Sequence, residues 1–83
     1  MNSNQEIMQQ IREIVVEYTN THLINDKINT DDVYIVWFCK TLQNWKALAS
    51  STLKDSMYFE LTYNGDDDEI YVDVYRKWVN FAK

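Results

Sequence analysis

Few side chains in this chain could carry catalytic chemistry. The sequence holds one histidine, His22, and one cysteine, Cys39, which excludes an intramolecular disulfide and a zinc site built from several His and Cys ligands. A Ser-His-Asp arrangement would need His22 beside a nucleophile, and no spacing in the sequence indicates one. We expect Cys39 to be a small, buried apolar residue. The sequence therefore predicts a protein that is not an enzyme and uses no metal or cofactor.

The carboxylates give two weaker signals. Glu60 and Asp73 are expected to be neighbours on adjacent strands, where two carboxyl groups could share a proton as an acid/base pair. We favour a solvated acidic patch, because no nucleophile or metal motif accompanies them. The acidic run at 66–69 lacks the alternating acids of an EF-hand. We expect a solvated loop there, with an ion site or a contact for a basic partner as alternatives.

Two lysines are expected near one turn. If residue 41 faces residue 45, Lys40 and Lys46 face each other on one side of a sheet, where they could contact an anion or a phosphate. The alternative is a pair of solvated lysines that protect a sheet edge.

An N-terminal helix is the first element that the sequence predicts. Ser3 and Glu6 have the spacing of a capping box. Apolar residues then recur at the helical spacing of three and four, and we expect the run at 19–21 to end the helix because Thr and Asn favour competing local hydrogen bonds. The apolar positions are Ile7, Ile11, Ile14, Val15 and Tyr18. In the polar connection at 23–32, we expect Leu23, Ile24 and Ile28 to pack against the core.

Four strands are predicted after the helix, at 33–41, 45–51, 57–63 and 69–75, because these segments are rich in β-branched and aromatic residues. The joining segments are short enough for hairpins, and Asn64-Gly65 is the strongest turn signal. The predicted fold is α+β, a single domain over 1–83 with the helix packed on a four-stranded antiparallel meander. Residues 74–83 are expected to form a short C-terminal helix, with continuation of the last strand as the alternative.

The strand registers follow from the turn lengths. Residue 41 is set opposite 45, 51 opposite 57, and 63 opposite 70, which gives one wholly apolar face for the helix to cover. That inner face would carry Ile35, Trp37, Cys39, Ala47, Ala49, Phe59, Leu61, Tyr63, Ile70, Val72 and Val74.

The outer face of the predicted sheet is more apolar than a solvent face should be, and contiguous apolar patches usually mark contacts. The C-terminal segment with Trp78 and Phe81, a second copy of the chain in a homo-oligomer, or a foreign partner could cover it. Tyrosines on this face are typical of a binding surface. The alternative is that they are ordinary residues of a partly solvated strand and have no role in binding. The candidate partner-binding residues are Phe38, Leu48, Tyr58, Glu60, Tyr71, Asp73 and Tyr75.

Length, charge and hydropathy exclude several classes of protein. Thirteen acidic and eight basic residues leave a net charge of -5 over 83 residues, which argues against direct nucleic-acid binding. No apolar run approaches the ~20 residues of a membrane span, and the polar N-terminus does not look like a signal peptide. We expect a cytoplasmic protein.

Part of the sequence resembles a known family. Trp37 is followed by an Asn-Trp-Lys turn at 44–46 and a Tyr-Asn-Gly hairpin at 63–65, and over 33–78 this order is similar to a family of small uncharacterised proteins from phages and prophages of Gram-positive bacteria. The resemblance implies a phage-derived gene product acting in the bacterial host cell. It implies no activity and no site residues.

The resulting hypothesis is a non-enzymatic protein-interaction module, a phage-encoded modulator or inhibitor of a host factor such as a defence protein. The alternative is a small-ligand or nucleotide-signal binding protein that uses the aromatic outer face, with Lys40 and Lys46 on the phosphates.

Overall fold

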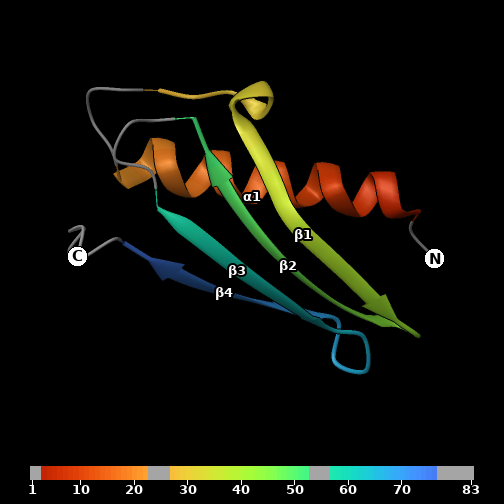
Figure 1. Cartoon of the computed structure of the whole chain (residues 1–83). Helices are drawn as coiled ribbons and strands as arrows, with labels where there is room; N and C mark the ends of the chain where they lie inside the picture. The colour runs from red at the N-terminus through yellow and green to blue at the C-terminus, as the bar shows by residue number, and fades with distance from the viewer. Residues whose placement is uncertain (1–2, 23–26, 53–56, 77–83) are drawn as a thin grey trace, which may run out of the picture.

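The fold is α+β, with one helix packed on a four-stranded antiparallel sheet (Figure 1). The computed structural model describes residues 3–22, 27–52 and 57–76. The strand order β1-β2-β3-β4 is that of a simple meander, as predicted. The elements are α1 (Asn4–His22), the 3₁₀ turn η1 (Thr30–Asp32), β1 (Val33–Thr41), β2 (Asn44–Ser51), β3 (Tyr58–Asn64) and β4 (Glu69–Tyr75).

The start of α1 is confirmed, but its predicted end is wrong. The Glu6 backbone N–H donates to Ser3 Oγ at 3.2 Å, and the Ser3 N–H donates to Glu6 Oε1 at 3.4 Å, which is the capping box. The helix continues through the Thr-Asn-Thr run to His22. Thr19 faces the core and is only 2% exposed, and the Thr21 hydroxyl donates to the Glu17 carbonyl at 2.7 Å. Tertiary packing here outweighs the weak helix propensity of these residues.

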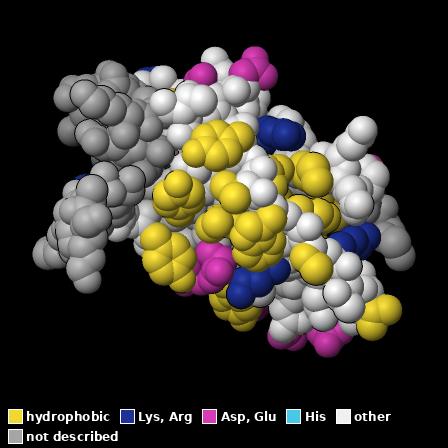
Figure 2. Space-filling model, in the orientation of Figure 1, with side chains coloured by type: hydrophobic (Ala, Val, Ile, Leu, Met, Phe, Trp, Pro, Cys, Tyr) yellow, Lys and Arg dark blue, Asp and Glu magenta, His cyan; other side chains and the backbone are white. Residues whose placement is uncertain are grey.

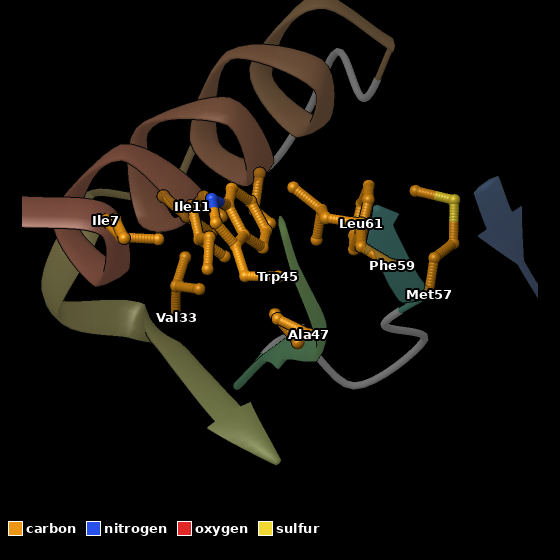
Figure 3. Close-up of a cluster of buried hydrophobic side chains, with 11 residues drawn as sticks. Ile7, Ile11, Val33, Trp45, Ala47, Met57, Phe59 and Leu61 are labelled. Atoms are coloured by element: carbon orange, nitrogen blue, oxygen red, sulfur yellow. The ribbon is translucent and has the colours of Figure 1, made fainter. Parts of the chain in front are cut away.

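The core lies between α1 and the inner face of the sheet. Ile7, Ile11 and Val15 of the helix belong to one buried cluster with residues of β2 and β3, and Figure 3 shows several of these side chains meeting beneath the helix. Ala47 and Ala49 are completely buried, and their small side chains leave room for the helix on the sheet.

The connection between helix and sheet is also fixed to the core. Ile28 is buried as predicted, and the Asn20 side chain both donates to the Ile28 carbonyl and accepts from its N–H, at 2.9 Å each. Leu23 and Ile24 lie outside the described residues.

Two of the three predicted registers are confirmed. Between β2 and β3, Trp45 lies opposite Tyr63, which is the register predicted by setting residue 51 opposite 57. Between β3 and β4, Tyr63 lies opposite Ile70, as predicted.

The predicted register between β1 and β2 is wrong. Lys40, rather than Thr41, lies opposite Trp45, and the register shifts between Ile35 and Trp37. This is a β-bulge, in which one extra residue of β1 moves the following side chains to the other face. Trp37 and Cys39 therefore lie on the outer face, and Phe38 and Lys40 on the inner face, each opposite to the prediction.

The end of the chain is described only in part. Val74 and Tyr75 belong to β4, so the predicted C-terminal helix does not begin at 74. Residues 77–83, including Trp78 and Phe81, lie outside the described part. Within that part, no helix is both long and apolar enough to cross a membrane.

Candidate functional site

The outer face of the sheet carries a broad group of exposed aromatic side chains. The strands pass in front of α1 in Figure 1, so the same view in Figure 2 shows this face, where hydrophobic side chains gather around a few charged ones. Trp37 is 42% exposed, and Tyr71 and Tyr75 are each 52% exposed. We call the aromatic and aliphatic residues of this face the outer patch. It consists of the exposed residues Tyr34, Val36, Trp37, Tyr58, Tyr71 and Tyr75, together with the partly buried Leu48.

Most of the predicted partner-binding residues do lie on this face. Leu48 is opposite Glu60, Glu60 is opposite Asp73, and Tyr58 is opposite Tyr75. Tyr71 lies opposite Thr62, two residues along the strands from the Glu60–Asp73 pair and therefore on the same face. The β2, β3 and β4 side of the candidate site is therefore placed as the sequence predicts, while its role in binding stays a prediction.

The β1 side of the site needs a correction. Phe38 points to the inner face, where its ring centroid lies 5.9 Å from that of Trp45. Trp37 takes its place opposite Leu48, and sequence reasoning missed it. Cys39 is exposed instead of buried. No sequence signal separates the two placements, because residues 33–39 are all apolar or aromatic and satisfy either register.

A single ion pair lies at the centre of the described outer face. Lys46 Nζ is 3.7 Å from Glu60 Oε2. The Glu60 carboxylate also raises the pKa of the Tyr75 hydroxyl, mainly through its negative charge and with a contribution from a hydrogen bond. Glu60 therefore has a cation and a phenol as neighbours in addition to Asp73.

The two candidate anion-contacting lysines do not form a pair. Lys46 lies on the outer face opposite Cys39, whereas Lys40 lies opposite Trp45 and lines a hollow on the inner side. The prediction that Lys40 and Lys46 face each other is wrong, because the bulge reverses the end of β1.

The acidic turn between β3 and β4 is tied to its surroundings. Asp66 Oδ1 accepts from the Gln43 side-chain amide at 2.7 Å, and Asp68 Oδ1 accepts from the Tyr63 hydroxyl at 2.8 Å. Asp67 accepts from Asn64 at 3.1 Å, and Glu69 accepts from Tyr71 at 2.5 Å.

The hydrogen bonds to Asp68 and Glu69 are the main reason that the pKa values of Tyr63 and Tyr71 are raised. The described residues hold no cluster of three potential metal ligands.

Comparison with known proteins gives a family but no activity. The model of a family of unknown function, DUF6275, matches residues 8–83, so the chain belongs to that family. The match confirms the resemblance to an uncharacterised family and extends it over most of α1. No curated protein and no solved structure matches the chain.

Proposed function

We propose that this DUF6275 member is a non-enzymatic interaction module that docks a partner protein on its outer patch. The observation that supports this is the exposure of Trp37, Tyr58, Tyr71 and Tyr75 together on one sheet face. Tyrosine and tryptophan are enriched at protein interfaces because they bury a large area at a low entropy cost. A contiguous patch of this kind usually marks a contact surface.

The charges around the patch define the partner's chemistry. Glu60 and Asp73 contribute two negative charges and Lys46 one positive charge, and the acidic turn lies at one end of β3 and β4. The whole chain carries a net charge of -5. A partner surface with an apolar centre and a rim of Lys or Arg complements this arrangement, and opposite charges would also accelerate association.

The biological setting is part of the same proposal. The resemblance over 33–78 supports a phage or prophage origin in Gram-positive bacteria. The partner would then be a host factor in the bacterial cytoplasm, which the protein inhibits or modulates. A nucleotide held between Lys40 and Lys46 is not proposed, because these side chains lie on opposite faces of the sheet.

The test compares charge substitutions on the two faces of the sheet. Trp37→Glu and Tyr71→Glu place a carboxylate in the outer patch. Val72→Glu is the matched control, because Val72 is the next residue of β4, is also exposed, and lies on the inner face opposite Leu61. Each tagged variant, with unchanged circular dichroism, is used to capture proteins from bacterial host lysate after nuclease treatment.

Three outcomes decide the proposal. Capture of one stoichiometric host protein by the wild type and by Val72→Glu, with loss of that protein in Trp37→Glu and Tyr71→Glu, supports docking on the outer patch. Equal capture by all four proteins contradicts the site. Association only between copies of the chain, seen as a doubled mass in light scattering, contradicts a foreign partner.

A further inference from the structure

A concave site lies on the side of the sheet opposite the outer patch. It is an open hollow of about 710 Å³ between the N-terminal half of α1 and the inner face at the hairpin ends. This volume is within the ~300–1,000 Å³ range of small-molecule pockets. It does not involve the outer patch, so it is independent of the proposed docking function. Its lining residues include Ile7, Gln10, Lys40, Tyr63, Asp68 and Ile70.

We propose that this pocket binds a small monocarboxylate with an aromatic or other apolar body. The apolar part would lie against Tyr63 and Ile70, which are half-buried and line the hollow. The carboxylate would contact the Lys40 ammonium group.

The apolar wall is held in place before any ligand arrives. The Tyr63 ring stacks on Trp45, with centroids 5.7 Å apart and planes 16° from parallel, and Trp45 is only 5% exposed. The Tyr63 hydroxyl is fixed by its hydrogen bond to Asp68. Figure 3 shows the Trp45 side chain extending from the sheet toward α1 beside Ile11. A wall fixed in this way loses little entropy on binding.

The two turns that border the pocket are also fastened together. The Gly65 N–H donates to Asn44 Oδ1 at 2.8 Å, and the Gln43 side chain donates to Asp66 at 2.7 Å. These bonds join the β1–β2 turn to the β3–β4 turn. The rim of the pocket is therefore not formed by two independently moving loops.

The charge of Lys40 selects an anion. Lys40 is partly buried and has no acidic partner within 4.0 Å among the residues that the structure describes, whereas Lys46 has Glu60. The one carboxylate in the pocket lining, Asp68, accepts a hydrogen bond from the Tyr63 hydroxyl. A partly buried ammonium group gains most from a charge-assisted hydrogen bond to an incoming anion.

The same surroundings favour a single negative charge over a phosphate chain. Four consecutive acidic residues occupy 66–69, and Asp68 itself lines the pocket. The negative charge of Asp68 in the lining repels a di- or triphosphate more strongly than a monoanion. A carboxylate balances Lys40 and adds the least repulsion.

Phenylacetate is a suitable probe, with phenylacetamide as its neutral counterpart and ATP as the polyanion. Each is titrated into the ¹⁵N-labelled full-length chain, and two-dimensional NMR spectra report both folding and the site of contact. We expect saturable shifts with phenylacetate at Lys40, Tyr63 and Ile70 and at the Trp45 indole N–H. Phenylacetamide and ATP should bind at least ~10-fold more weakly, which is a difference in binding free energy of about 1.4 kcal/mol or more.

Two lysine variants complete the test. Lys40→Gln should weaken phenylacetate binding about tenfold, and Lys46→Gln, the matched control on the outer face, should leave it unchanged. Equal binding of acid and amide, shifts confined to the outer patch, or no saturable shift up to about 10 mM would each overturn the proposal. None of these outcomes bears on partner capture by the outer patch.

Discussion

Gly65 shows how one residue joins the two hairpins. Its φ is not positive, so conformational freedom does not explain the glycine. A Cβ at this position would lie 2.3 Å from Gln43 Cγ and 2.5 Å from the Gln43 carbonyl oxygen. The backbone of one turn thus lies directly against the other, and only a residue without a side chain allows this approach.

We predict that Gly65→Ala lowers the free energy of unfolding by about 1–3 kcal/mol, the usual cost of overpacking. The added methyl group must push the two turns apart and weaken the Gly65–Asn44 hydrogen bond. Urea unfolding followed by tryptophan fluorescence measures the change. Asp67→Asn is the control in the same exposed turn, because it keeps an oxygen that can accept from Asn64, and it should stay within about 0.5 kcal/mol of wild type. Equal effects of the two substitutions would show that the close approach to Gln43 is unimportant.

At the scale of elements, the bulge in β1 decides which aromatic ring supports the core. Phe38 contacts Trp45 and packs against the buried cluster, whereas Trp37 is exposed on the outer face. We expect Phe38→Ala to cost about 2–4 kcal/mol of unfolding free energy, below the upper values for fully buried rings. Trp37→Ala should cost under about 1 kcal/mol, although tryptophan is the larger side chain.

Urea midpoints of the two variants measure this difference, with far-UV circular dichroism to confirm that both fold. The result distinguishes the bulged register from the regular one, since a regular β1 would bury Trp37 and expose Phe38. A larger loss of stability in Trp37→Ala would therefore contradict the bulge.

The sequence predicts β2, β3 and β4 well because their two faces differ in chemistry. Lys46, Glu60 and Asp73 alternate with apolar neighbours, so a shift of one residue would bury a charge. β1 has no such marker between 33 and 39, where every side chain is apolar or aromatic. Its register depends on the bulge and on the two-residue turn, where Leu42 has a φ of 56°. That is why Phe38 was assigned to the candidate site and Trp37 was not.

The inner pocket could not be predicted from the sequence either, because it also depends on the bulge in β1. It needs Lys40 on the same side as Tyr63 and Ile70, and the regular register places Lys40 on the other face. The hydrogen bonds that join the two turns connect residues 21 and 23 positions apart, and no local pattern indicates them. Contacts of this range follow from the complete fold rather than from strand periodicity.

At the scale of the whole molecule, three tyrosine–carboxylate contacts link stability to alkaline pH. The pKa values of Tyr63, Tyr71 and Tyr75 are raised above 10.0, the first two mainly by hydrogen bonds to Asp68 and Glu69 and the third mainly by the charge of Glu60. The folded state therefore holds these protons more tightly than the unfolded chain. Their contribution to stability is complete below the unfolded pKa of about 10 and is lost as the pH rises through the higher folded values.

These three tyrosines should leave the melting temperature unchanged between pH 8 and 9.5. Their deprotonation should lower it from about pH 10 upward. Calorimetry across this range gives the melting curve, and ultraviolet absorbance of tyrosinate gives the titration directly. Tyr63→Phe removes one of the three contacts and should make the alkaline fall shallower. Because Tyr71 and Tyr75 belong to the outer patch, a bound partner that covers them should delay their deprotonation further. Tyrosine titration midpoints that match those of the urea-unfolded chain would contradict the three contacts together.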